Sequence, residues 1–333
     1  QGLQLHLDAL DAQRLPDSEP LDAEVDARER LSDRLFSRLL KRWPQCEAPI
    51  EAPAWLRLSG LLPSGRLGAA AWAQERTKLD ALLSALRAAE GFDSGEAISL
   101  PVDVSIDGCR LVGEVPGLHA RTGGGHWLLR GFARTRVNSE KSDLLAEDEL
   151  DFRRRLPLFL DWALLRLMTV QGAAQLEPLR VLALIDRDAS SPWTDGLNAW
   201  DAALCKADAP TRARMLDELV QRLSLLLDFW REGQGARLPY LPRTSWAALC
   251  EPVEGKRADS APYSERLAKA VSEAWSGGDQ FTGEADYGPG YARLLFGALD
   301  TESGSEDIAR LLDFAQRLLA CITLDAPERE GAA

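Results

Sequence analysis

Cysteine and histidine are scarce in this chain, with five and three residues among 333. The cysteines lie far apart and form no CxxC pair, so neither a zinc site nor a disulfide framework is indicated. His119 and His126 lie within one short segment, but no third ligand is near them in the sequence. We therefore expect no metal site, and a cytoplasmic location where thiols stay reduced.

Long apolar runs and nucleotide-binding motifs are also missing. No apolar run approaches the roughly 20 residues that span a bilayer, and the first residues lack the basic segment and the apolar segment of a signal peptide. The chain has no GxxxxGKS or GxxxxGKT element, and the glycines at 123–125 are not followed by Lys and then Ser or Thr. We expect no membrane contact, no bound nucleotide and no other cofactor.

Positive charge is in deficit, because 52 acidic residues face 39 lysines and arginines, which gives a net charge of -13. Domains that bind nucleic acid through their overall field are basic, so any DNA contact here must be local or shared with a partner chain. One basic and aromatic island surrounds the glycine-rich turn. Its members are the candidate nucleic-acid-binding residues: Arg121, His126, Trp127, Arg130, Arg134 and Arg136.

Two interpretations of this island are open. In the first, the arginines touch phosphates and Trp127 stacks on a splayed base, an interaction worth about 1–3 kcal/mol per base. In the second, the glycines form a simple turn, Trp127 lies in the core and the arginines lie in solvent. The run Arg153–Arg155 also allows two interpretations. It could contact a phosphate or a partner chain, or it could lie on a solvated face, and we expect the solvated face.

The length of 333 residues allows one large domain with additions, or two domains. Residues 1–25 are acidic and interrupted by prolines, which is typical of a linker, here one that would lead from upstream domains. We expect one domain over residues 26–325 and a disordered tail over 326–333.

Hydrophobic periodicity predicts the elements of this domain. Val102–Ile106 and Leu111–Val115 alternate in polarity and are joined by Asp107-Gly108, a dipeptide typical of a tight hairpin turn. The other strands are expected over 126–132 and 179–185, with a buried helix over 156–170 between them. Further helices are expected over 27–43, 67–89, 211–231, 262–275, 289–299 and 305–321.

The order of helix, three strands, helix and strand resembles the core of the restriction-endonuclease-like nucleases. In that family an Asp late in the second strand, and an Asp or Glu two residues before a Lys on the third, hold Mg²⁺ beside the phosphate. Here Pro116 stands where the first Asp is expected, and Arg130 lies where the acidic-x-Lys element is expected. We therefore expect an α/β fold with this core and additional C-terminal helices, catalytically inactive.

A relocated active site is the alternative. The nearest acidic side chains are those of Asp103, Asp107 and Glu114. Alternation along an exposed strand face explains them more simply than a displaced Mg²⁺ site does.

Several ordered segments resemble the C-terminal region of the RecC family, the gamma subunit of bacterial exodeoxyribonuclease V, over roughly residues 25–322. Leu238 to Trp246 is the strongest of them, and its prolines also predict an extended, rigid backbone. The others are Gly60–Gly65, Gly113–Leu118, Leu160–Trp162, Trp275–Gly277, Phe281–Tyr287 and Arg293–Gly297.

The resemblance implies a nuclease-like domain without catalytic activity in the RecBCD helicase-nuclease. It implies RecB and RecD as partner subunits, and double-stranded DNA ends and unwound single strands as ligands. The expected action is mechanical, as a wedge and a docking platform at the point where duplex DNA is split. A pure protein-interaction module that never touches DNA is the remaining alternative.

Overall fold

The computed structural model describes residues 50–58, 62, 64–88, 97–132, 150–170, 176–185, 192–253, 261–278, 281–286 and 291–324. The chain divides into two compact units. The first unit comprises residues 1–89, 131–135 and 184–189, and the second comprises the rest. The expected helix over 27–43, the linker over 1–25 and the tail over 326–333 lie outside the described residues.

The first unit contains α3 (Ala54–Leu58) and α4 (Gly65–Ala88), and α4 confirms the helix expected over 67–89. Trp72, Leu79 and Leu83 recur at helical spacing and are buried. The indole Nε1 of Trp72 donates a hydrogen bond to the carbonyl oxygen of Ile50 at 3.1 Å, which ties the segment before α3 to α4.

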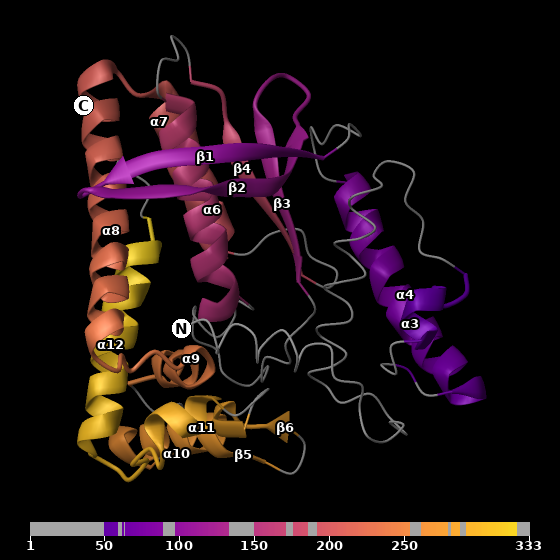
Figure 1. Ribbon diagram of the computed structural model, residues 1–333, viewed down its shortest axis with the longest axis vertical. Coiled ribbons are helices and arrows are strands. Elements are labelled where there is room, and N and C mark those ends of the chain that lie inside the picture. Colours follow the sequence, from indigo (N-terminus) through magenta and orange to yellow (C-terminus); the bar gives the residue numbers. More distant parts are fainter. Residues whose placement is uncertain are drawn as a thin grey trace. The chain divides into compact units, whose positions relative to one another are not determined.

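The second unit is built on the predicted hairpin, β1 (Ile98–Ile106) and β2 (Cys109–Ala120). The turn residues Asp107 and Gly108 have φ values of 47° and 74°, the left-handed conformation that a two-residue hairpin turn requires. Alternate β1 side chains, those of Val102, Val104 and Ile106, are buried. In Figure 1 the hairpin crosses α6, which contacts β1.

A β-bulge interrupts β2 at Pro116 and Gly117. Leu100 pairs with Val115 and Ile98 pairs with Leu118, so two steps along β1 face three steps along β2. Gly117 has φ 78°, the left-handed conformation of glycine in this type of bulge, and proline fits where the ladder is broken. Because of the extra residue, Val115 and Leu118 are both buried although they are three positions apart.

The sheet has the strand order β1-β2-β3-β4, with β3 at His126–Phe132 and β4 at Leu179–Ile185 as predicted. The amide of His126 donates to the carbonyl oxygen of Pro178 at 3.0 Å, so β3 and β4 begin at the same end of the sheet. The buried helix α6 (Phe152–Val170) provides the crossover that two such strands need.

Helix α7 (Pro192–Lys206) was not predicted, and it covers the outer side of β4. The side-chain oxygen of Asn198 accepts from the amide of Val181 at 2.7 Å, and its NH₂ donates back to the Val181 carbonyl at 2.9 Å. Asp201 accepts from the amide of Leu179 at 2.9 Å. These side chains satisfy backbone groups that an edge strand would otherwise expose.

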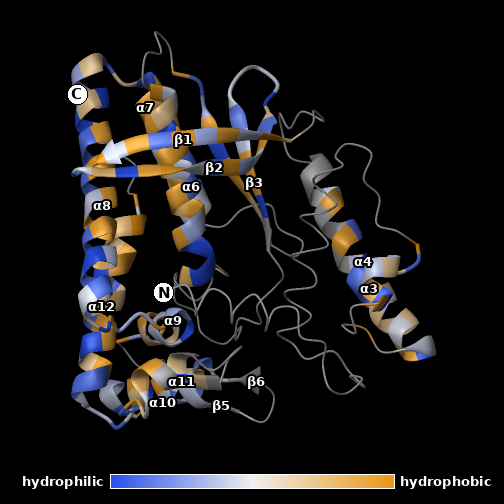
Figure 2. Ribbon diagram, viewed as in Figure 1, coloured by the Kyte–Doolittle hydropathy of each residue, from blue (hydrophilic) through white to orange (hydrophobic). Residues whose placement is uncertain are grey.

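The remaining helices are α8 (Ala209–Gly235), α9 (Pro242–Leu249), α10 (Tyr263–Ser276), α11 (Tyr291–Phe296) and α12 (Glu306–Ile322). All but α9 confirm predicted helices. In Figure 1 α8 and α12 lie side by side, and α9, α10 and α11 gather beyond them with the short β5 (Gly277–Gly278) and β6 (Phe281–Thr282) strands. Figure 2 shows apolar side chains along both α10 and α12, the helices whose buried side chains join one core cluster.

The expectation of an extended segment through Trp246 is wrong beyond Leu241, because α9 begins at Pro242. Proline at the first helical position needs no amide hydrogen, so the same residue that suggested a rigid extended chain starts a helix. The Glu284 carboxylate replaces a side-chain cap, accepting from the amides of Arg243 at 3.1 Å and Thr244 at 2.8 Å. The part before Pro242 remains extended and braces the domain, since the Tyr240 ring packs on Phe314 with centroids 6.3 Å apart.

Tyr240 should ionise well above the usual range. Burial, with smaller effects of Asp151 and Glu284, raises the pKa of its phenol from 10.0 to about 12. A raised pKa contributes stability that is complete below pH 10 and is lost as the pH rises through about 12. The tyrosinate absorbance of the wild type minus that of Tyr240→Phe should therefore show a midpoint near pH 12, and a midpoint near pH 10 would contradict this environment.

The expectation of a solvated Arg153–Arg155 run is wrong. Arg154 and Arg155 are 8% and 2% exposed, because the run lies in the first turn of α6 against other elements. The guanidinium of Arg155 lies over the Trp246 ring at 4.3 Å and the Trp193 ring at 5.4 Å. The Asp151 carboxylate pairs with Arg153 at 2.7 Å and approaches Arg154 at 4.0 Å. This run is therefore a structural cluster.

Candidate nucleic-acid interface

The glycine-rich turn between β2 and β3 is held from both sides. The amide of Arg121 donates to the Gly125 carbonyl at 3.1 Å, and the amide of Gly124 donates to the Arg121 carbonyl at 3.0 Å. The Gly125 amide reaches across to the Glu177 carboxylate at 3.1 Å. Gly123, Gly124 and Gly125 all have positive φ, so the turn depends on residues without a side chain.

Trp127 lies in the core, with 6% of its surface exposed. The guanidinium carbon of Arg121 is 5.9 Å from the indole centroid, and that of Arg180, from β4, is 6.0 Å from it. The indole is therefore not open to a nucleic-acid base in this conformation. Arg121 is partly buried rather than fully solvated, and it packs on an aromatic ring.

The two histidines face opposite sides of the sheet. His119, which pairs with Trp127 across β2 and β3, is fully buried. His126 lines a cavity of about 270 Å³ between the sheet and α6, together with Leu118, Leu165, Arg166 and Thr169 among others. Among the residues that the structure describes, no three His, Cys, Asp or Glu side chains lie close enough to hold a metal ion.

Arg130 and Pro116, which sequence places at the two positions of lost metal ligands, meet in space. The Arg130 guanidinium donates to the carbonyl oxygens of Pro116 and Leu129, both at 2.9 Å, and pairs with the Asp161 carboxylate of α6 at 2.5 Å. A Cβ atom on Gly117 would lie 2.8 Å from this guanidinium, so the bulge leaves room for it. Three oxygens of the kind that bind hard cations thus surround a built-in positive charge.

The acids of the alternative site are engaged elsewhere or exposed. On the exposed face of the hairpin, the Nε and Nη2 atoms of Arg110 donate to the two carboxylate oxygens of Asp103, at 2.7 and 2.6 Å. This hydrogen bonding holds the pKa of Asp103 below its usual value. Asp107 lies in the hairpin turn, where its backbone carbonyl accepts from Arg231 at 3.0 Å, and Glu114 is exposed.

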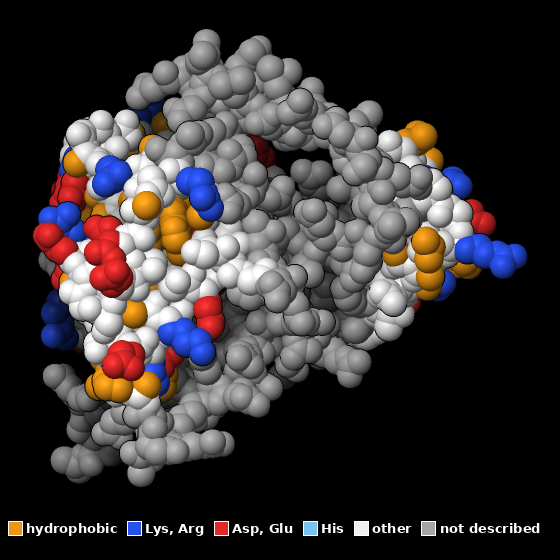
Figure 3. All heavy atoms as spheres, turned by 90° about the horizontal axis from the view of Figure 1, so that it is seen from below, with side chains coloured by type: hydrophobic (Ala, Val, Ile, Leu, Met, Phe, Trp, Pro, Cys, Tyr) orange, Lys and Arg blue, Asp and Glu red, His pale blue; other side chains and the backbone are white. Residues whose placement is uncertain are grey.

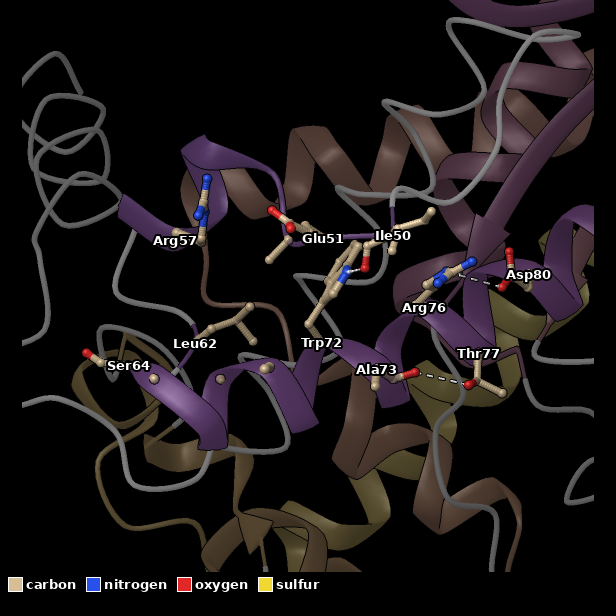
Figure 4. Close-up of a pocket in the computed structure, with 14 residues that line it drawn as sticks. Ile50, Glu51, Arg57, Leu62, Ser64, Trp72, Ala73, Arg76, Thr77 and Asp80 are labelled. Carbon is tan, nitrogen blue, oxygen red and sulfur yellow. Dashed lines mark hydrogen bonds and ion pairs between the residues drawn. The ribbon is translucent and has the colours of Figure 1, made fainter.

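The first unit has its own groove, of about 880 Å³, along α4. Figure 4 shows Trp72 in its middle, Arg57 and Leu62 towards one end, and the ion pair of Arg76 with Asp80 at the other. Its charged side chains are of both signs, so it has no marked preference for an anion or a cation.

Of the six candidate residues, Arg134 and Arg136 lie outside the described residues. The other four do not form one cluster, because Arg130 and His126 face α6 whereas Arg121 packs on Trp127. Arg180 was missed, since it lies more than fifty residues along the chain and only strand pairing brings it to Trp127. No local signal in the sequence marks it.

A family model, the RecC C-terminal domain, matches residues 1–251. The chain belongs to this RecC family. The match covers the whole sheet and helices α3 to α9, whereas the segments Trp275–Gly277 and Phe281–Tyr287 that resemble RecC lie beyond it. No curated protein matches the chain.

Membership in the RecC family implies a role within the RecBCD complex. In the described part of the chain no helix is long and apolar enough to cross a membrane. In Figure 3, acidic and basic side chains are interspersed among the described residues that are visible.

Proposed function

We propose that this RecC domain is a non-catalytic, DNA-engaging and subunit-docking part of the cytoplasmic RecBCD helicase-nuclease. It acts where duplex ends are split during double-strand-break repair, and it packs against RecB and RecD. Motors elsewhere in the complex pull the DNA, while this domain supplies a wedge and a platform. Its core is restriction-endonuclease-like in element order, and it needs neither nucleotide nor metal of its own.

The observation that carries this proposal is the position of Arg130. Its guanidinium is held by two carbonyl oxygens and one carboxylate at the junction of the β2 bulge, β3 and α6. A divalent cation placed among the same oxygens would be repelled by this fixed charge. Asp161 is also only one carboxylate, already neutralised, whereas the nuclease chemistry needs clustered carboxylates around Mg²⁺.

The test of inactivity is a nuclease assay on the purified chain, with linear and forked DNA in Mg²⁺ or Mn²⁺. No metal-dependent cleavage above that of a mock purification is expected. Cleavage that requires metal and disappears in Glu114→Ala would overturn the proposal in favour of a relocated site. Val112→Ala, exposed on the same strand, is the matched control for nonspecific effects of substitution.

A pure protein-interaction module is the second candidate, favoured by large apolar side chains that remain exposed, such as Trp230 at 59% and Val253 at 73%. Charge reversal of Arg121, Arg134 and Arg136 separates the two functions. If this domain engages DNA, the assembled complex should bind forked DNA more weakly and unwind it more slowly. Unchanged binding and unwinding would favour the interaction module.

A further inference from the structure

Two guanidinium groups contact the same indole ring, from strands on either side of it. Arg121 follows β2 and Arg180 lies in β4, while Trp127 lies in β3 between them. Neither arginine forms an ion pair with an acid in the described part of the chain. Arg130 and Arg166, by contrast, each have an aspartate partner.

Hydrogen bonds between the strand ends hold the backbone that carries the two arginines. The Arg121 amide is tied to Gly125, the Gly125 amide to the Glu177 side chain, and the His126 amide to the Pro178 carbonyl. These bonds join the ends of β2, β3 and β4 at the position of both arginines. With neighbouring strands about 4.8 Å apart, the backbones of Arg121 and Arg180 are roughly 10 Å apart.

The chemistry of the two side chains points to phosphate. A guanidinium is a planar fork of donors that matches phosphate oxygens, and it is always charged. Among the described residues, Glu177 is the one acid whose hydrogen bond places it at this turn, where its carboxylate accepts from the Gly125 amide. The two arginines therefore leave a local excess of positive charge in an acidic chain.

We propose that Arg121 and Arg180 together contact the phosphate backbone of a nucleic-acid strand, with Trp127 as the rigid spacer between them. The proposal rests on the DNA-engaging function above, and it adds Arg180 and the kind of contact. Because Trp127 is buried between the two cations, the contact does not involve base stacking. It is independent of sequence, as phosphate contacts are.

The experiment measures binding of forked DNA to the assembled complex over a series of salt concentrations, by fluorescence anisotropy. It compares the wild type with Arg121→Gln, Arg180→Gln and the double variant. The slope of log K against log salt is negative, and its magnitude should decrease by about 0.7–0.9 for each phosphate contact removed, and by roughly twice that in the double variant. Arg317→Gln is the matched control, because Arg317 also lies over an aromatic ring, Phe229, at 4.9 Å.

Each outcome separates the two proposals. If the salt slope of DNA binding for Arg180→Gln equals that for Arg317→Gln, the inference of a two-arginine phosphate contact is overturned. If only Arg121→Gln has a shallower salt slope, the DNA-engaging function is still supported. Unchanged slopes in all variants would count against both. A second experiment adds inorganic phosphate and follows thermal unfolding. If phosphate stabilises the wild type but not Arg180→Gln, and the salt slope of DNA binding is unchanged, the site binds free phosphate instead of nucleic acid.

Discussion

Replacement of Arg166 by Met is expected to lower the free energy of unfolding by about 3–5 kcal/mol at neutral pH, because it leaves a buried carboxylate without its cation. Arg166 in α6 and Asp201 in α7 form an ion pair whose side chains are 0% and 1% exposed. Arg166 also donates to the Glu177 carbonyl at 3.1 Å, and Asp201 accepts from the Leu179 amide. Urea unfolding followed by tryptophan fluorescence measures the loss.

The loss should shrink as the pH falls. Burial raises the pKa of the Asp201 carboxyl, and the Arg166 guanidinium opposes this rise. Without the guanidinium, the pKa of Asp201 in the folded variant rises further. Below the unfolded pKa, near 3.8, the Asp201 carboxyl is protonated in both states and its burial does not destabilise the variant. The variant loses stability as the pH rises from there through the folded pKa, because the buried carboxyl must then ionise. The gap between variant and wild type should therefore be smallest in acid.

Arg310→Met is the matched control for this prediction. Arg310 pairs with Glu306 four residues earlier on α12, and both side chains are largely exposed. Surface pairs of this kind contribute little, so the unfolding midpoint should barely move. Equal effects of Arg166→Met and Arg310→Met, or a loss at Arg166 that does not depend on pH, would show that the buried pair is not held as described.

The parts of the fold that the sequence predicted are those with local causes. Asp107-Gly108 specifies its own turn, and the apolar run of α6 can only be a buried helix at that length. The strands β3 and β4 were also predicted, because their apolar residues are bounded by turn residues. The resemblance of ordered sequence segments to RecC agrees with the match of the RecC C-terminal domain to residues 1–251.

The parts that the sequence could not predict depend on tertiary pairing. The bulge at Pro116 and Gly117 appears only when the register of β1 against β2 is known. Burial of Arg155 requires Trp246, which lies about ninety positions away in the sequence. Helix α7 contains Gly196 and Asn198, which have weak helix propensity, and its docking on β4 outweighs this weakness. The same holds for the site, where Pro116 and Arg130 were singled out but their contact with Asp161 was not.

Replacement of Gly125 by Ala is expected to lower the free energy of unfolding by roughly 3 kcal/mol or more, for two separate reasons. Gly125 has φ 84°, a conformation that L-residues rarely adopt. A Cβ atom there would also lie 2.2 Å from the carbonyl oxygen of Pro178, which is backbone and cannot swing aside. The junction of β3 and β4 would have to open, and the hydrogen bond from His126 to Pro178 would lengthen.

Gly124→Ala separates these two reasons, because it meets the same conformational strain without the collision. Gly124 has φ 99° and nothing within 4 Å of the position of a Cβ atom, so its replacement should lower the free energy of unfolding by only about 1–2 kcal/mol. Urea unfolding of both variants measures the difference, and amide exchange at His126 should accelerate only in Gly125→Ala. Equal losses would mean that β3 and β4 are not held together at this turn.

Since Arg121 and Arg180 are positioned by the same junction, Gly125→Ala should also weaken forked-DNA binding by the assembled complex, whereas Gly124→Ala should not.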